Sequence, residues 1–444
     1  MKPTLPKGTR DFLPQEVKKR NYIFTIIKKY FALYGFDPIE TPAMESLDTL
    51  TGKYGDEGDK LLFKILNNGN YLAEVPSELL AERESKGALP FLSKRGLRYD
   101  LTVPFARYIV MNRQHIKLPF KRSAIQPVWR ADRPQKGRYQ EFYQCDADVA
   151  GSDSLISEIE FVQIYDQVFS ELNLPVIIRI NHRKLLQGIV ESAGMGDRFE
   201  EVVTFIDKLD KIEAERIKKD MLDKGFHIDS VTNLFEILEN KNIEDLPVSK
   251  LNEKAMTGLK ETQYVITLSQ KFGLKNQLKF DATLARGLSY YTGCIFEVTA
   301  VDANMGSIGG GGRYNDLTAA FGMPDIPGVG ISFGAERIYD LMEEKKLFPI
   351  EISSGGRLII LFMDESVSEY AFNIAYQLRK AGIACEIYPV AAKINKLMSY
   401  ANERNFQYAA LVGLDEMNAS KVTLKNMSTG VQQSVLFSEI GYHI

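Results

Sequence analysis

The sequence is short of the side chains that build metal sites and disulfide frameworks. Its 444 residues include 3 cysteines and 4 histidines, and Cys145, Cys294 and Cys385 lie far apart along the chain. An odd number of widely spaced cysteines forms neither a disulfide framework nor a zinc pattern, and isolated histidines add no ligand cluster. We therefore expect no protein-bound metal and no disulfide, as in a reducing compartment.

Long apolar runs are also missing. No run of eighteen apolar residues occurs, and the first residues, Met1–Pro14, lack the apolar core of a signal peptide. We therefore expect a cytoplasmic protein without a membrane-spanning helix.

Neither sign of charge is in large excess. The chain has 55 Lys and Arg residues against 58 Asp and Glu residues, a net charge of −3. This balance excludes a protein that coats nucleic acids with a cationic surface, but it allows a local basic site. The hydrophobic share of 45% and the charged share of 25% are ordinary for a globular protein. At about 100–200 residues per domain, the length predicts two to four domains.

Near the N-terminus, periodicity predicts a helix followed by an edge segment. Residues Gln15–Tyr34 repeat apolar side chains at three- and four-residue spacing, which predicts an amphipathic helix that ends at Gly35. In the next segment, Gly35–Ser46, Pro38 and Pro42 favour extended backbone and remove hydrogen-bond donors. This predicts a sheet edge or an interface segment.

Changes in pattern predict the domain organisation. Strand and helix signals mix up to residue 180, and they include a helix over residues 102–111 and strands over residues 123–128 and 141–149. Strand signals stop over residues 181–260, where one apolar stripe is formed by Phe199, Val202, Val203, Ile206 and Leu209, and strands return over residues 261–350. We interpret residues 181–260, which are mostly charged and helical in pattern, as an insertion that splits one core into residues 1–180 and 261–350. After a Ser- and Gly-rich linker, strands and helices alternate over residues 356–444, which predicts an α/β domain with a largely parallel sheet.

The sharpest local charge feature is a basic stretch followed by an acidic one. Arg113–Arg138 holds eight basic residues and one acidic residue, whereas Glu141–Glu160 holds six acidic residues and no basic one. The plainest interpretation is a solvated basic loop beside the acidic start of a helix. However, Arg130 and Asp132 share one face of an extended segment, and Arg138 stands close to aromatic residues. Because guanidinium groups bind phosphate and stack on planar bases, these details favour a nucleotide-like ligand.

Further segments combine glycine with polar or aromatic side chains. They are Leu284–Gly293 with two adjacent tyrosines, Ser307–Leu317 with four successive glycines, and Pro327–Arg337 with alternating apolar and small residues. The four glycines suit a flexible hairpin or a close approach of the backbone to a ligand or another strand. Arg337, in the first turn of a predicted helix, opposes the helix dipole, and a bound anion, the neighbouring Glu336 or another carboxylate would offset this cost.

Taken in order, these segments resemble the histidyl-tRNA synthetase family of class II aminoacyl-tRNA synthetases. The matching blocks are Lys7–Pro14, Gly35–Ser46, Trp129–Val149, Leu284–Gly293, Ser307–Leu317 and Pro327–Arg337. The resemblance covers essentially the whole chain. It implies an α/β protein: an α+β catalytic core with an antiparallel sheet flanked by helices, a helical insertion and a C-terminal α/β anticodon-binding domain. It also implies a homodimer with the segment around Pro42 at the interface.

The resemblance implies roles for the residues that match the family's motifs. The ATP-binding residues would be Arg130, Asp132, Arg138, Phe142 and Arg337. The histidine-binding residues would be Asp100, Thr102, Arg130, Gln144, Asp148, Arg286, Tyr290, Tyr291 and Tyr314. Among them, Asp100, Thr102 and Gln144 would receive the α-amino group, and Asp148 and Tyr291 the imidazole nitrogens. Gln135 would face the acceptor end of the tRNA.

The implied activity is that of a histidine–tRNA ligase. L-histidine and ATP would give histidyl-adenylate and pyrophosphate, and histidine would then pass to the 3′ end of its tRNA. Arg130 and Arg286 would be the catalytic residues, because a carboxylate nucleophile needs placement and charge neutralisation rather than a general base. Mg²⁺ would bind mainly through the ATP phosphates. Ser289 departs from the family's commoner Asp, and Asp132 and Asp148 depart from its commoner Glu.

Two other interpretations compete with this one. A non-catalytic paralogue, such as the regulatory partner of an ATP phosphoribosyltransferase, usually lacks the insertion and the C-terminal domain, and this chain has both segments. A class II synthetase for proline, threonine or glycine is disfavoured by the adjacent Tyr290 and Tyr291.

Overall fold

The computed structural model describes residues 2–51, 55–209, 212–240, 242–285, 291–315, 317–353 and 357–444. The chain divides into two compact units, Met1–Leu347 and Phe348–Ile444. Each unit is built around a β-sheet of its own.

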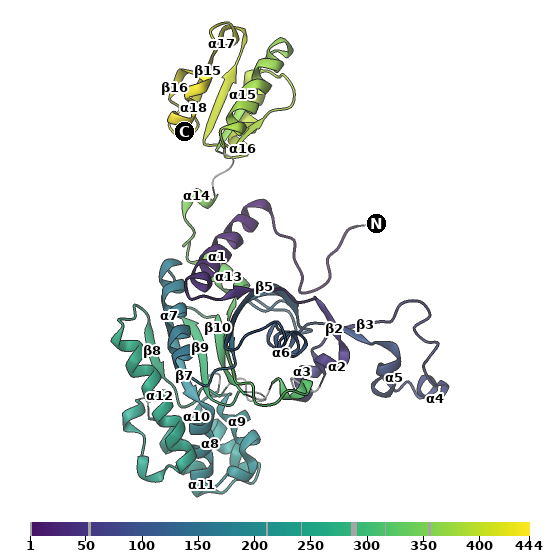
Figure 1. The fold of residues 1–444 in the computed structure, drawn as a ribbon, viewed down its shortest axis with the longest axis vertical. Helices are drawn as coiled ribbons and strands as arrows, with labels where there is room; N and C mark the ends of the chain where they lie inside the picture. The colour runs from purple at the N-terminus through teal and green to yellow at the C-terminus, as the bar shows by residue number, and fades with distance from the viewer. Residues whose placement is uncertain are drawn as a thin grey trace. The chain divides into compact units, whose positions relative to one another are not determined.

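An eight-stranded sheet forms the centre of the first unit (Figure 1), with the order β1-β5-β6-β11-β10-β9-β7-β8. The strands are β1 (Asp37–Pro38), β5 (Phe120–Trp129), β6 (Glu141–Ala150), β11 (Gly328–Gly334), β10 (Gly309–Tyr314), β9 (Cys294–Ala300), β7 (Val176–His182) and β8 (Gln277–Phe280). From β5 to β7, neighbouring strands are antiparallel. The two outer strands are parallel to their neighbours: β1 pairs with β5, and β8 pairs with β7. The expected antiparallel core is confirmed, and β1 lies at the sheet edge, as Pro38 predicts.

Helices cover one face of this sheet. They are α1 (Pro14–Leu33), α7 (Ile156–Glu171) and α13 (Ala335–Glu344) (Figure 1). Helix α1 contacts both α7 and α13, and each of the three helices contacts β6 or β11. Helix α1 follows the predicted range closely, and Gly35 ends it with a φ of 75°. The ring centroid of Phe333 on β11 lies 6.0 Å from that of Phe31 and 4.8 Å from that of Tyr165. Since side chains alternate along a strand, Ser332 faces the opposite side of the sheet.

The four successive glycines form part of strand β10, in the middle of the sheet. A Cβ atom on Gly311 would lie 2.1 Å from the carbonyl oxygen of Gly330, and one on Gly312 would lie 2.7 Å from that of Cys294. Neighbouring backbone occupies the space of a side chain, so the close-approach interpretation is right and the flexible hairpin is wrong.

The segment before β5 is a smaller subassembly. A three-stranded sheet has the order β2-β4-β3, and a segment with two short helices projects from it (Figure 1). The elements are β2 (Met44–Ser46), α2 (Leu47–Leu50), α3 (Gly55–Lys60), β3 (Lys64–Ile65), α4 (Ser77–Ala81), α5 (Ser85–Leu92), β4 (Arg95–Leu97) and α6 (Thr102–Met111). The sequence predicts α6 at these bounds, but α4 and α5 are not predicted.

Helices fill the chain between β7 and β8. They are α8 (Arg183–Ser192), α9 (Phe199–Ile206), α10 (Ala214–Asp223), α11 (Ile228–Leu238) and α12 (Glu253–Lys271). The described residues between these two strands form no strand, and α12 runs past the predicted limit at residue 260. Val202, Val203 and Ile206 are buried, as the predicted apolar stripe requires. The subdivision of the first unit into core and insertion stays a prediction.

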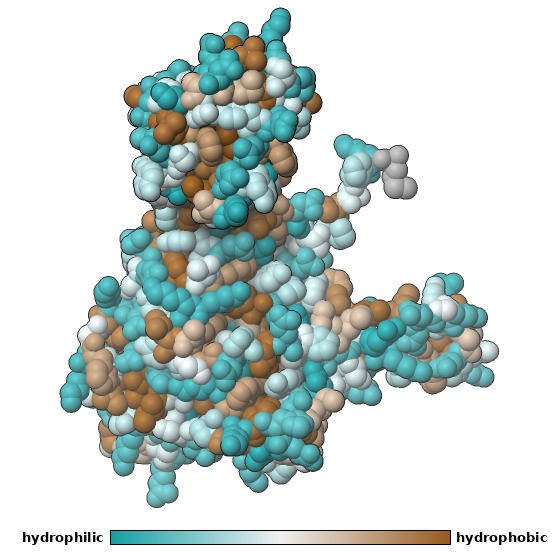
Figure 2. All heavy atoms as spheres, turned by 45° about the horizontal axis from the view of Figure 1, so that its top comes forward, coloured by the Kyte–Doolittle hydropathy of each residue, from teal (hydrophilic) through white to brown (hydrophobic). Residues whose placement is uncertain are grey.

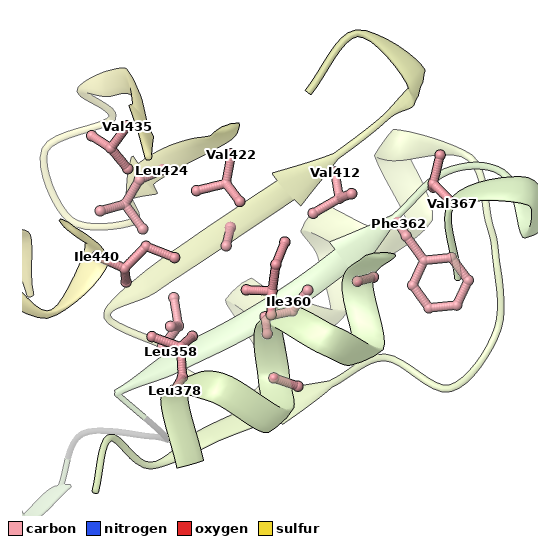
Figure 3. Close-up of a cluster of buried hydrophobic side chains, with 14 residues drawn as sticks. Leu358, Ile360, Phe362, Val367, Leu378, Val412, Val422, Leu424, Val435 and Ile440 are labelled. Atoms are coloured by element: carbon pink, nitrogen blue, oxygen red, sulfur yellow. The ribbon is translucent and has the colours of Figure 1, made fainter. Parts of the chain in front are cut away.

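The second unit is a five-stranded sheet between helices. Its strand order is β13-β12-β14-β15-β16, parallel from β13 to β14 and antiparallel beyond. The elements are β12 (Leu358–Phe362), α15 (Ser368–Lys380), β13 (Cys385–Ile387), α16 (Ile394–Glu403), β14 (Tyr408–Val412), α17 (Leu414–Asn418), β15 (Lys421–Asn426), β16 (Gln432–Leu436) and α18 (Ile440–His443), after the short α14 (Ile350–Ser353). Figure 3 shows Leu358, Ile360 and Leu378 within the core on one face of this sheet. The parallel part is predicted, whereas β15 and β16 are not.

The surface carries scattered apolar residues. In Figure 2, hydrophobic residues are interspersed with hydrophilic ones over the visible face. Single exposed apolar residues are normal for globular proteins. None of the described helices has the length and apolar character needed to cross a membrane.

Gly311→Ala tests the close packing of β10. The added methyl group would meet the Gly330 oxygen at 2.1 Å and the Ile331 Cα atom at 2.8 Å, and neither backbone atom can rotate away. We expect the free energy of unfolding of the first unit to fall by about 1–3 kcal/mol. Urea titration measures it through the fluorescence of Trp129, the single tryptophan of the chain.

Gly306→Ala is the matched control for this substitution. Its methyl group would have Arg337 Nη1, at 3.5 Å, as its nearest neighbour. Equal stabilities of the two variants would contradict the packing described for β10.

Candidate active site

A cavity of about 650 Å³ opens on the sheet face that carries the side chains of Gln144 and Asp148. The predicted site residues that line it are Asp100, Thr102, Arg130, Asp132, Arg138, Phe142, Gln144, Asp148, Tyr291, Tyr314 and Arg337. The fold thus brings together residues that are more than 200 positions apart in the sequence. Their individual roles stay predictions.

The remaining predicted residues fall elsewhere. Gln135 lies on an exposed turn between β5 and β6, where Gln135 and Arg138 exchange backbone hydrogen bonds of 3.1 and 2.9 Å. Gln135 does not line the cavity. Arg286, Ser289 and Tyr290 lie outside the described residues.

Guanidinium groups gather at one part of the cavity. Arg130 Nε donates to the Tyr99 carbonyl oxygen (3.1 Å), and its guanidinium carbon lies 4.2 Å from the Tyr99 ring centroid and 5.3 Å from that of Phe142. Arg138 Nη1 lies 3.8 Å from Asp132 Oδ1. Arg337 Nε donates to the Gly137 carbonyl oxygen at 2.7 Å. Because each of these groups also lines the cavity, their positive charge faces an incoming ligand.

The carboxylate of Glu336, which was considered as a partner of Arg337, pairs with Arg20. Its carboxylate lies 2.8 Å from Arg20 Nη2 and accepts a hydrogen bond from the Tyr143 backbone N–H (2.9 Å). Arg20 comes from α1, so this ion pair joins α1 to α13. Glu336 is thus paired with Arg20, and a bound anion that balances Arg337 stays a prediction.

A buried arginine fixes the carboxylate of Asp148, one of the residues that line the cavity. Arg122 is 1% exposed, and its Nη2 lies 2.6 Å from Asp148 Oδ2 and donates to the Leu101 carbonyl oxygen at 3.1 Å. Tyr314 donates to the other oxygen, Asp148 Oδ1, at 2.5 Å. The carboxylate of Asp148 is therefore fixed from two sides.

The same ion pair corrects the interpretation of the charge stretches. Arg122 of β5 pairs with Asp148 of β6, and Lys121 Nζ of β5 lies 2.6 Å from Glu160 Oε2 of α7. Part of the basic stretch therefore neutralises the acidic stretch inside the fold and is not a solvated basic loop. Arg130 and Arg138, at the end of the hairpin, keep their place at the cavity.

Sequence reasoning missed Asp146, which also lines the cavity and is buried. Burial raises the pKa of Asp146 to about 7, and the nearby Arg122 lowers it in part. Burial likewise raises the pKa of Asp148 and that of Glu336. The signal that could have found Asp146 is the alternation of Gln144, Asp146 and Asp148 along one strand, which puts the three side chains on one face.

Comparison with known proteins decides the family. Residues 93–338 match the family model described as histidyl-tRNA synthetase, and residues 354–442 match that of an anticodon binding domain. A histidine–tRNA ligase from Bacteroides fragilis is 51% identical over 445 aligned residues, which cover 99% of this chain and 98% of that protein. The chain belongs to the histidyl-tRNA synthetase family.

Solved structures agree with this membership. Histidyl-tRNA synthetase from a Nostoc species covers 100% of both chains with a TM-score of 0.84 and 26% identity. A Bacillus halodurans protein described as an ATP phosphoribosyltransferase regulatory subunit/histidyl-tRNA synthetase has a TM-score of 0.74 and 21% identity, and it covers 93% of this chain and 99% of that chain. This second likeness concerns the fold alone. The class II family and the C-terminal α/β anticodon-binding domain are therefore confirmed.

The raised carboxyl pKa values predict a pH dependence of stability. A carboxyl group with a folded-state pKa above its unfolded value of about 3.9 binds more protons in the folded state between the two values. Its stabilising contribution is present below about pH 4 and is lost as the pH rises toward about 7. We expect Asp146→Asn to remove the contribution of Asp146 to the slope of the free energy of unfolding against pH, which is at most about 1.4 kcal/mol per pH unit.

Urea titrations of the ligand-free protein from about pH 4.5 to 7.5 measure this slope through the fluorescence of Trp129. If the profiles of wild type and Asp146→Asn are parallel, the pKa of Asp146 is not raised.

Proposed function

We propose that this chain is a histidine–tRNA ligase: it forms histidyl-adenylate from L-histidine and ATP and passes histidine to the 3′ end of its tRNA. The observation that carries the proposal is the cavity, which gathers the residues of the family's motifs in a chain 51% identical to a ligase of that name. As a tRNA ligase, it would act in the cytoplasm.

ATP would bind among the arginines of the cavity. Arg130 would contact the α-phosphate and the histidine carboxylate, and Arg138 and Arg337 would contact the distal phosphates and the adenine, with Phe142 under the base. Guanidinium groups suit this because they bind phosphate oxygens in pairs. The contacts of Arg130 with Tyr99 support the assignment, since they hold its side chain in place before a ligand arrives.

Mg²⁺ would arrive with ATP. This ion keeps several waters and usually binds through substrate phosphates and one or two carboxylates. Asp132 offers a carboxylate beside Arg138. The described residues contain no group of three or more His, Cys, Asp or Glu side chains that could hold a metal ion without such help. The ion would neutralise charge on the phosphates.

Histidine would bind where the acidic side chains line the cavity. Asp100, Thr102 and Gln144 would receive the α-amino group, and Asp148 and Tyr291 would bond the imidazole nitrogens. Tyr290 and Tyr314 would shape the pocket. The fixed carboxylate of Asp148 supports this assignment, because a preorganised acceptor loses little entropy when it binds.

The first step needs placement more than proton transfer. An oxygen of the histidine carboxylate attacks the α-phosphorus, and the bond from phosphorus to the leaving pyrophosphate breaks. The carboxylate is already ionised, so no base is required. Arg130 and Arg286 would offset the charge that builds on the α-phosphate. A terminal ribose hydroxyl of the tRNA then attacks the adenylate carbonyl, and AMP and a proton leave.

The tRNA would meet the chain at two places. Gln135, on its exposed turn, would face the acceptor end. The second unit would bind the anticodon, and its match to an anticodon binding domain supports this.

Two copies of the chain would pair through the region around Pro42. Strand β1 lies at the edge of the large sheet and β2 at the edge of the small one. Met44 beside this segment is 51% exposed, and Leu72 of the projecting segment is 45% exposed (Figure 1). Sheet edges and exposed apolar side chains are usual features of interaction sites, so both support a homodimer.

Exchange of pyrophosphate into ATP tests the proposed reaction directly. We expect purified protein to exchange labelled pyrophosphate when L-histidine is present and to show at most background exchange with proline, threonine or glycine. The hydrogen-bonding pocket gives the reason, because a substrate without matching donors leaves buried polar groups unpaired. The absence of histidine-dependent exchange would refute the proposed function.

Arg286→Ala tests the proposed catalytic role. We expect exchange to fall by about two to three orders of magnitude, the usual loss when one group that stabilises a transition-state charge is removed. Arg404→Ala is the control: it removes a surface arginine of the second unit, and exchange requires no tRNA. Near-normal exchange by the Arg286 variant would show that this side chain is not catalytic.

A further inference from the structure

Acceptor atoms without hydrogen-bond partners follow strand β6 along the cavity. Among the described residues, Gln144 Oε1 and Asp146 Oδ1 are buried and have no such partner, whereas Asp148 Oδ2 has Arg122 Nη2 at 2.6 Å. All three side chains line the cavity, and each residue is about 6.8 Å from the next one along the strand. Buried polar atoms are nearly always paired in folded proteins. This row therefore indicates a ligand rich in N–H donors.

Arg122, Asp146 and Asp148 form a buried charge cluster. Its two carboxylates carry more negative charge than the single guanidinium group of Arg122 can balance. Arg122 Nη2 lies 2.6 Å from Asp148 Oδ2 but 3.9 Å from Asp146 Oδ2. Directly across from Asp146 stand Ala124 on β5 and Ser332 on β11, and neither residue is charged. An uncompensated buried charge is strongly unfavourable. A cationic ligand would supply the missing positive charge.

The neighbouring strand leaves room for this ligand. Gly330, Ser332 and Gly334 of β11 stand opposite Asp148, Asp146 and Gln144, in that order. Small side chains next to a row of acceptors keep the space in front of that row open. These β11 residues line the same cavity.

We propose that Asp146 is a specificity-determining residue of the histidine site, whose Oδ1 accepts a hydrogen bond from a nitrogen-bound hydrogen of histidine. The inference rests on the proposed function and extends it. The family's motifs assign Gln144 and Asp148 to the histidine site, but they do not assign Asp146, which lies between them. Histidine offers both N–H donors and positive charge, which match the acceptors and the excess charge of the cluster.

The proposal has a consequence for pH. The charged and titratable groups around Asp146 are Arg122 on β5, Asp148 on β6, Asp100 before α6, Arg98 after β4 and Tyr165 on α7. Burial raises the pKa of Asp146 to about 7 in the ligand-free protein. Because the ionised form binds the cation, the affinity for histidine rises as the pH rises through this value.

The experiment measures KM for histidine and for ATP in pyrophosphate exchange, from about pH 6 to 8. Asp146→Asn keeps the size of the side chain and removes its charge. We expect KM for histidine to rise roughly ten- to a hundredfold, as for loss of a charged hydrogen bond. KM for ATP should stay within about a factor of three. The KM for histidine of the variant should not fall with rising pH, as we expect it to do in the wild type.

Asp325→Asn is the matched control, an exposed carboxylate outside the cavity with a φ of 64° that asparagine tolerates. Asp146→Ser provides a smaller second variant, and Trp129 fluorescence checks that each variant is folded. Unchanged KM for histidine in a folded Asp146 variant would overturn the proposal. If neither variant folds, the wild-type protein still tests the proposal. A wild-type KM for histidine that does not fall between about pH 6 and 8 would also overturn the proposal. Wild-type protein without histidine-dependent exchange would refute the proposed function instead.

Discussion

The buried guanidinium group of Arg122 faces more negative charge than it can neutralise, and the acidic part of the cavity depends on this imbalance. Arg122 comes from β5, and its carboxylate neighbours come from β6. Tyr314, from β10, fixes the second oxygen of Asp148. The side chains from β5 and the distant β10 thus hold the carboxylate of Asp148 rigidly, whereas that of Asp146 is left without full compensation. A buried charge of this kind is tolerable when a proton or a cationic substrate balances it.

The sheet separates this polar site from the apolar core. Along β6 and β11, alternate side chains point to helices α1, α7 and α13 or to the cavity, so Phe333 packs in the core while its neighbour Ser332 lines the site. The glycines of β10 let that strand lie against its neighbours at a distance that a side chain would prevent. The backbone therefore creates the open space, and the side chains of β6 supply its chemistry.

Much of this arrangement could be predicted from the sequence. Local patterns predict α1, α6, β5 and β6 near their observed bounds, because helix and strand periodicity is a property of adjacent residues. The glycine-rich β10 lacks such a pattern, although it pairs with β9 and β11, which precede and follow it in the chain. Likewise, β16 begins with Gln432, Gln433 and Ser434, which give no apolar alternation.

The chemistry of the site could be predicted in part. Family motifs point to most of the lining residues, including Arg130, Asp148 and Arg337. The partner of Arg122 depends on strand pairing, so the basic stretch looks solvated in the sequence although part of it is buried in ion pairs. Asp146 was missed for the same reason: its position opposite the uncharged Ala124 and Ser332 becomes visible when β5, β6 and β11 are placed side by side.

The most direct test of this account is a crystal structure of the protein with bound L-histidine. The distance to measure joins Asp146 Oδ1 to the nearest nitrogen of the ligand. We predict about 2.7–3.2 Å, the range of an N–H···O hydrogen bond, with the row from Gln144 to Asp148 facing the ligand. A histidine bound in the cavity with every nitrogen beyond about 4 Å from that oxygen would contradict the account.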